Sequence, residues 1–254
     1  NPVTRETAGR SEQFIGEWLR RGGARDKIQI ATKLVGARSV IRDAPQSPAL
    51  LRACVEQSLR NLNTDVIDLY QIHWPTRPHY HFRRNWGFDA SQNDVNAVIA
   101  EFDSLILTLK ELVAEGKIRA FGLSNDSAWG LMRWNDRAAL HGGPRVDSIQ
   151  NEYALKARLY DTDLAEVGVH EQVTLLAYSP LAAGLLTGKY RNGAIPAGSR
   201  LSLNGDLGGR HVPRAHHAVE AYAAVAQKHG IDLVHMAMAW FAARPFPVVP
   251  IFGA

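Results

Sequence analysis

Short apolar runs rich in β-branched residues alternate along the chain with longer segments of helical periodicity. The runs are nearly continuous in apolar character, as expected for strands that are covered on both faces. We predict six strands, at residues 28–33 (IQIATK), 66–73 (VIDLYQIH), 118–125 (IRAFGLSN), 148–152 (SIQNE), 174–179 (TLLAYS) and 248–251 (VVPI). Such alternation is typical of α/β proteins in which helical crossovers join parallel strands.

The helical segments carry apolar side chains at i, i+3 and i+4, which places them on one stripe of a helix. Three stripes are clear: Phe14, Ile15, Trp18 and Leu19; Leu51, Val55, Leu59 and Leu62; and Leu105, Leu109, Leu112 and Val113. Further helices are predicted near residues 128–140, 161–167, 215–229 and 233–243.

Two connections, residues 76–97 and 191–213, are long, polar and rich in Gly and Pro. We predict that neither supplies core elements, because long loops of this kind are usually functional lids or disordered segments. The first carries aromatic and basic side chains, at Tyr80, Phe82, Arg83, Arg84, Trp86 and Phe88. These could form a lid or pocket wall, or else an oligomer contact or a mobile loop.

The composition changes this picture little. The 254 residues, 46% of them hydrophobic, suffice for a single domain over residues 1–254, and the net charge of +4 is spread among 29 basic and 25 acidic side chains. That distribution argues against a nucleic-acid partner. With Cys54 as the single cysteine and no apolar run of about 20 residues, we expect a cytoplasmic protein without a membrane segment. The loop-like start and strand-like end suggest a domain incomplete at both ends.

Polar side chains recur at or beside the C-terminal ends of the predicted strands: Lys33, His73, Asn125, Gln150 and Tyr178. In a parallel barrel these ends meet at one rim, where active sites are built. Taken singly, each has an ordinary structural explanation, such as a solvated lysine or a packed histidine. Their joint occurrence at one rim indicates a functional site.

Other chemistry is weaker or absent. His79 and His81 have a spacing that metal ligands can use, but no Cys or carboxylate accompanies them, so we assign no metal and expect a solvated loop. Neither a G-x-G-x-x-G turn after a strand nor a phosphate-binding P-loop motif occurs.

Several segments, in order, resemble the aldo-keto reductase family: KIQIATK, DVIDLYQIHWP, LKELVAEGKIRAFGLSN, SIQNEY, LLAYSPLAAGLLTGKY, IPAGSR and PIFGA. EGKIRAFGLSN and AYSPLAAGLLTGKY are the most specific. The segment around 76–97 and GKYRNGAIPAGSR are most similar to the bacterial Tas-like branch, which is related to the β subunits of voltage-gated potassium channels. The resemblance implies a (β/α)8 TIM barrel in which the six strands are the third to eighth. The first two strands and the C-terminal helix would then lie outside residues 1–254.

The resemblance also implies chemistry. Lys33 and His73 match the catalytic Lys and His, whereas the family's catalytic Asp and Tyr would precede Asn1. The matching cofactor residues are Ser124, Asn125 and Gln150 for the nicotinamide carboxamide, Tyr178 for ring stacking, Ser179, Pro180, Leu181 and Gly184 along the pyrophosphate, Lys189 and Arg200 for positive charge, and Gly253 in a final phosphate-binding turn.

We therefore expect an oxidoreductase that reduces aldehydes or ketones with NADPH, rather than NAD, and acts on a small-molecule carbonyl substrate. Both a monomer and a homo-oligomer are compatible with the sequence. The alternative is a nucleotide-binding, redox-sensing regulatory subunit with little turnover.

Overall fold

A computed structural model describes residues 4–36, 39 and 44–253 of the chain. The six strands are β1 (Ala31–Leu34), β2 (Ile67–Ile72), β3 (Ile118–Ser124), β4 (Val146–Glu152), β5 (Thr174–Tyr178) and β6 (Val248–Ile251). They follow the order β1-β2-β3-β4-β5-β6, so each strand lies next to its neighbour in sequence. The pairs β1–β2, β2–β3 and β5–β6 are parallel. The predicted α/β class and the six predicted strands are confirmed.

The chain divides into two compact units, Asn1–Ile149 and Gln150–Ala254, with the boundary inside β4. Each unit is described by itself below. The single domain expected over residues 1–254 stays a prediction.

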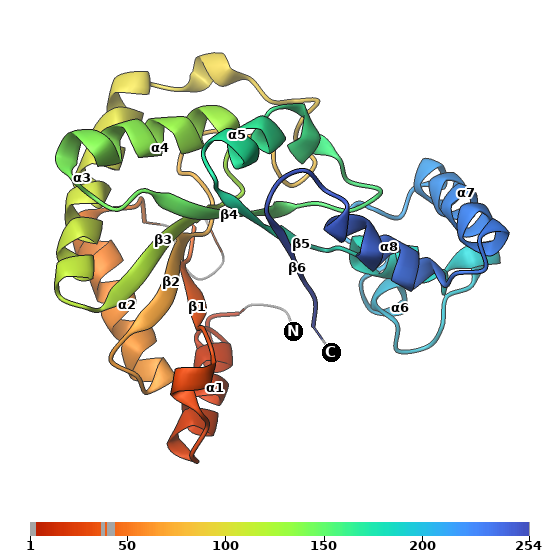
Figure 1. The fold of residues 1–254 in the computed structure, drawn as a ribbon, viewed down its shortest axis with the longest axis horizontal. Coiled ribbons are helices and arrows are strands. Elements are labelled where there is room, and N and C mark those ends of the chain that lie inside the picture. Colours follow the sequence, from red (N-terminus) through yellow and green to blue (C-terminus); the bar gives the residue numbers. More distant parts are fainter. Residues whose placement is uncertain (1–3, 37–38, 40–43, 254) are drawn as a thin grey trace. The chain divides into compact units, whose positions relative to one another are not determined.

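In the first unit, the helices α1 (Arg10–Arg20), α2 (Pro48–Leu62), α3 (Val95–Ala114) and α4 (Ala128–His141) pack one against the next beside β1, β2 and β3 (Figure 1). Side-chain caps define three of their starts. Ser47, Asp94 and Ser127 accept backbone N–H groups from the first turns of α2, α3 and α4. Such caps satisfy donors that have no partner inside the helix. Two short 3-10 helices, η1 (Arg25–Lys27) and η2 (Ala90–Gln92), complete this unit.

The first predicted stripe lies on α1, largely at the surface. Phe14 and Trp18 are 73% and 47% exposed. α1 instead contacts α2 through Gly16, where a Cβ would lie 2.1 Å from the Asn61 carbonyl oxygen. The close helix contact therefore uses the small residue, and the aromatic side chains lie at the surface. In α2 and α3, by contrast, most of the predicted apolar stripe is buried.

β1 begins at Ala31, three residues later than predicted. The reason lies in Asp68, whose carboxylate accepts the Ile30 N–H at 2.8 Å. That carboxylate also pairs with Arg25 and Arg119. A side chain therefore satisfies the backbone donor of Ile30, directly before the strand begins.

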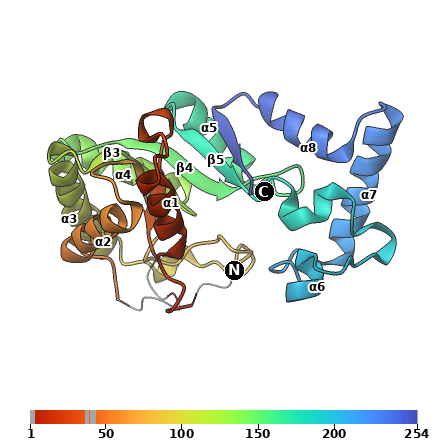
Figure 2. The ribbon, with the colours of Figure 1, turned by 90° about the horizontal axis from the view of Figure 1, so that it is seen from below.

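The second unit contains α5 (Leu164–His170), α6 (Arg200–Asn204), α7 (Pro213–Lys228) and α8 (Leu233–Ala242) with the strand pair β5–β6. The short helices η3 (Leu159–Thr162), η4 (Ala182–Thr187) and η5 (Arg191–Gly193) also lie here. Both α7 and α8 pack on η4 (Figure 2).

The expectation that residues 191–213 supply no core element is wrong. Leu201, on α6, and Leu207 are buried in the same apolar cluster as Leu185, Leu186 and Tyr190. The Tyr190 hydroxyl accepts the Leu201 N–H at 3.3 Å, which fixes α6 to this cluster. Two leucines thus anchor a segment whose composition is otherwise polar.

Within the described part of the chain, no helix has both the length and the apolar character that crossing a bilayer requires.

Candidate active site

Lys33 and His73 lie beside each other at the ends of β1 and β2. In the parallel register Lys33 is opposite Gln71, and the His73 N–H donates to the Leu34 carbonyl oxygen at 3.1 Å. Side chains alternate between the faces of a strand, so Gln71 and His73 point to the same face, and Lys33 shares it as the partner of Gln71. The structure therefore places an ammonium and an imidazole on one face, at neighbouring strand ends.

Burial dominates the electrostatics of this pair. It lowers the pKa of Lys33, whose ammonium forms no ion pair with any of the described residues. Burial, followed by the nearby Lys33 ammonium, lowers the pKa of His73 to about 4. The ring of His73 is therefore neutral near pH 7, with one nitrogen available as a donor and the other as an acceptor.

Sequence reasoning missed the residues beneath this pair. Gln71 is fully buried, and its amide donates to the Leu123 carbonyl oxygen at 3.3 Å. Gly122, opposite Gln71 on β3, has no room for a side chain, because a Cβ would lie 2.7 Å from the Ser148 hydroxyl. A glutamine near the end of a largely apolar strand was the available signal, since buried polar side chains are uncommon without a specific partner.

Ser124 and Asn125, both buried, connect the end of β3 to His73. The Asn125 side-chain amide donates to the His73 carbonyl oxygen and to the Ser124 hydroxyl, each at 3.0 Å. Asn125 has a left-handed backbone (φ 52°), a conformation that Asn tolerates better than most residues. Both amide hydrogens of Asn125 are thus engaged within the protein.

A buried ion pair fastens the segment after β2 to the segment after β3. Arg77 pairs with Asp126, and the side chains of both are almost fully buried. The expectation of a solvated loop at His79 and His81 is wrong. His81 is buried with its Nε2 2.9 Å from the Asp126 carbonyl oxygen, and His79 is partly buried. Contacts between distant segments, which composition does not reveal, bury these rings.

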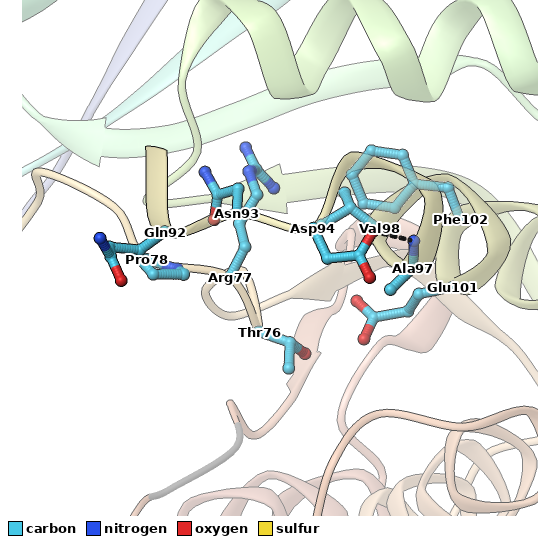
Figure 3. A pocket seen from close by; sticks show the side chains of 10 residues that line it. All are labelled: Thr76, Arg77, Pro78, Gln92, Asn93, Asp94, Ala97, Val98, Glu101 and Phe102. Carbon is cyan, nitrogen blue, oxygen red and sulfur yellow. Dashed lines mark hydrogen bonds between the residues drawn. The ribbon is translucent and has the colours of Figure 1, made fainter. Parts of the chain in front are cut away.

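Two cavities lie along the segment that follows β2. One, of about 170 Å³, is formed by residues 76–78, residues 92–94 and the first turns of α3 (Figure 3). Thr76 and the Glu101 carboxyl group lie at one side of it and the Arg77 guanidinium at the other (Figure 3). Burial raises the pKa of Glu101, and a Thr76 hydrogen bond opposes that rise. The second cavity, of about 600 Å³, begins at Trp74, directly after His73.

The second unit holds the remaining predicted residues. Tyr178 ends β5 and is followed by Ser179 in a left-handed conformation (φ 55°). Gly184 is left-handed at φ 98°, and a Cβ there would lie 3.1 Å from Cε and 3.4 Å from Nζ of Lys189. The structure thus brings Gly184 and Lys189 together so closely that a side chain at position 184 would be crowded by the lysine.

The other predicted residues of this unit are Gln150, Pro180, Leu181, Arg200 and Gly253. Arg200 begins α6, is exposed, and forms no ion pair within the described ranges. Gly253 follows β6 and is exposed, and apart from its chain neighbours no described residue lies within 4 Å of its Cβ position. Gln150 lies within β4, and Pro180 and Leu181 continue the chain from Ser179. The roles of all these residues stay predictions.

Parallel strands with polar groups at their C-terminal ends define an α/β enzyme scaffold of the barrel class. The sequence profile of the Aldo/keto reductase family matches residues 7–254. The chain therefore belongs to the aldo/keto reductase family, whose members are oxidoreductases.

Individual relatives agree with this assignment. The chain is 39% identical to Protein tas of Escherichia coli over 258 residues, covering all of this chain and 73% of that protein. It is 32% identical to an aldo-keto reductase of Babesia bovis, over 90% of this chain and 85% of the relative. Among solved structures, a glycerol dehydrogenase from Gluconobacter oxydans is similar with a TM-score of 0.69 at 29% identity, covering 97% of this chain and 68% of that one. The resemblance to the Tas-like branch is confirmed.

Proposed function

We propose that the complete protein containing this chain reduces aldehydes or ketones to alcohols with NADPH. The observation that carries the proposal is the Lys33 ammonium beside the neutral His73 imidazole at adjacent strand ends. Carbonyl reduction needs such a pair, because negative charge develops on the carbonyl oxygen as the carbon is attacked.

NADPH, when bound, would supply the hydride to the carbonyl carbon. The neutral His73 ring would donate one N–H to the carbonyl oxygen and orient it. The Lys33 ammonium would stabilise the charge that develops on that oxygen, and partial burial would strengthen the attraction by lowering the local dielectric constant. The resemblance implies a tyrosine as the proton donor, and a nearby cation would lower its phenol pKa from about 10 toward neutrality.

The residues present fit the chemistry of the cofactor. The Asn125 carbonyl oxygen and the Ser124 hydroxyl suit a carboxamide, which has both donors and an acceptor. The Gly184–Lys189 contact offers an ammonium beside backbone that carries no side chain, as close approach of a pyrophosphate requires. Arg200, an exposed guanidinium without an ion pair among described residues, supports NADPH over NAD, since guanidinium suits a 2′-phosphate.

Stopped-flow oxidation of NADPH by the complete protein, with 4-nitrobenzaldehyde as substrate, tests the proposal. Lys33→Met should lower kcat by about 10²- to 10⁴-fold, as loss of a group acting on the transferred proton typically does, with NADPH affinity nearly intact. Lys27→Met is the matched control, because Lys27 is an exposed lysine in η1 and should behave as wild type. No turnover by wild type across a panel of aldehydes, with tight NADPH binding, would favour the regulatory alternative.

A further inference from the structure

The larger cavity of the first unit is built entirely by residues that follow the proposed catalytic histidine. It extends from Trp74 to Arg84 and has a volume of about 600 Å³. Pockets for small organic ligands commonly measure about 300–1,000 Å³. The cavity is therefore large enough for a substrate body beyond its carbonyl group.

Aromatic rings connect His73 with this cavity. The centroids of His73 and Trp74 are 4.5 Å apart, and Trp74 meets Phe82 edge to face at 5.9 Å. Phe82 in turn contacts the His79 ring at 5.7 Å. Gly36 helps to hold the indole, because a Cβ there would overlap Trp74 at 1.9 Å. A flat apolar group attached to a carbonyl at His73 would thus contact the rings of Trp74 and Phe82.

The charge of the cavity is positive. Its lining includes two arginines and no acid. Arg77 is buried and paired with Asp126, whereas Arg84 is exposed and forms no ion pair or hydrogen bond with any described residue. Burial lowers the pKa of His79 to about 4, so this ring adds no charge near neutral pH. Smaller electrostatic effects act on the same pKa: it is lowered by His81, Arg84 and Arg77 and raised by Asp126. Arg84 is the unneutralised charge.

The backbone turns in an unusual way to produce this arrangement. Phe82 and Arg83 are consecutive left-handed residues, at φ 58° and 64°, and neither is glycine. Left-handed backbone is strained at residues other than glycine, and such strain gathers at functional sites. The turn places Phe82 and Arg84 on the cavity, while Arg83 between them is not part of its lining.

We propose that the preferred substrates are aromatic carbonyl compounds that carry an anionic group, with Arg84 binding the anion and Trp74 and Phe82 contacting the ring. This inference rests on the proposed function. The reaction itself is unchanged: a hydride and a proton convert the carbonyl to an alcohol, and NADPH becomes NADP⁺. We expect a carboxylate to bind the Arg84 guanidinium, because the planar arrangement of its N–H donors matches the two carboxylate oxygens.

The test compares two substrates that differ in charge and share a ring. With saturating NADPH, kcat/KM of the complete protein is measured for 4-carboxybenzaldehyde and for methyl 4-formylbenzoate. We expect the acid to be preferred about tenfold or more, chiefly through KM, and the preference to decline as NaCl is raised because salt screens an exposed charge.

Arg84→Gln should remove most of the preference, and Arg84→Lys should retain part of it. Arg83→Gln is the matched control, since it removes a neighbouring charge outside the lining and should keep the wild-type preference. NADPH affinity and circular dichroism verify folding of each variant. If Arg84→Gln does not fold, the salt dependence of the wild-type preference decides whether an exposed charge binds the anion.

Two failures are distinguishable. Absence of turnover for both substrates would overturn the proposed function. Turnover of both with equal kcat/KM, or a preference that survives Arg84→Gln or is insensitive to salt, would overturn the anionic-substrate inference and leave carbonyl reduction standing.

Discussion

Arg77→Met should destabilise the first unit far more than loss of an ordinary surface ion pair. The side chains of Arg77 and Asp126 are 5% and 3% exposed. Arg77 also donates to the Ser127 hydroxyl at 3.3 Å, and its guanidinium carbon lies 5.2 Å from the centre of the Trp129 ring. Gly130 makes room for the pair, since a Cβ there would lie 2.1 Å from both charged groups.

The magnitude follows from what the substitution leaves behind. Met keeps an apolar stem of similar length, so the main loss is the partner of the Asp126 carboxylate. Removing one partner of a buried ion pair typically costs about 3–5 kcal/mol. Asp126 still accepts the Ser127 N–H at 2.7 Å, which favours the lower end, about 3 kcal/mol. With a urea m-value of about 2 kcal/mol/M, the unfolding midpoint should fall by roughly 1.5 M.

Urea unfolding of the complete protein, followed by circular dichroism, measures this shift. Hydrogen exchange of residues 76–82 then shows whether the segment after β2 opens. Arg133→Met is the control, because the Arg133–Asp136 pair on α4 is 45% and 47% exposed and should contribute less than about 1 kcal/mol. The double variant Arg77→Met with Asp126→Asn should recover most of the loss, since Asn carries no charge. Equal costs for the two single arginine variants, or no recovery in the double variant, would refute the reasoning.

Three further predictions concern single groups. Lys33→Met should raise the pKa of His73 from about 4 toward 6.5, although burial, the larger cause of the lowered pKa, keeps it below 6.5. NMR titration of the histidine measures this change, and an unchanged pKa would contradict the electrostatic interaction between Lys33 and His73. Because the folded pKa of His73 lies below the unfolded one, the unfolded chain takes up the proton first, so stability falls as pH drops from about 6.5 to about 4; this loss should be smaller in Lys33→Met. Gly36→Ala should cost about 1–3 kcal/mol by overpacking against Trp74, and an unchanged melting temperature would show that the indole moves freely. Tyr160→Phe should be neutral or stabilising by up to about 1 kcal/mol, because the buried hydroxyl has no hydrogen-bond partner among described residues; a clear loss in thermal unfolding would reveal one.

The strands were predictable because buried parallel strands have a strong signature in the sequence. VIDLYQIH and IRAFGLSN are nearly continuous apolar runs, and β2 and β3 lie within them. The polar residues at their ends were equally visible, since His73 and Asn125 interrupt those runs at the last position. Position along a strand is local information, which a sequence carries directly.

What could not be predicted depends on partners that are distant in sequence. The stripe of Phe14 and Trp18 has helical periodicity, but periodicity does not say which face contacts α2. His81 is buried because its ring donates from Nε2 to the backbone carbonyl oxygen of Asp126, 45 residues away. Leu201 is buried because Tyr190 fixes a five-residue helix that is too short to show periodicity.

Lys33 is expected to be charged and His73 to be neutral, and these two protonation states depend on one another. Two adjacent cations at partly buried strand ends would repel, so the ammonium itself helps to keep the imidazole neutral. A neutral ring can donate to the carbonyl oxygen through one nitrogen without competing for the developing charge, which then meets the full charge of Lys33. Since the His73 pKa is about 4, its protonation should not limit kcat/KM between pH 5 and 8. An acid limb near pH 6.5 that moves when His73 is replaced would mean that the ring is charged in the working enzyme, and that the two groups do not divide the task in this way.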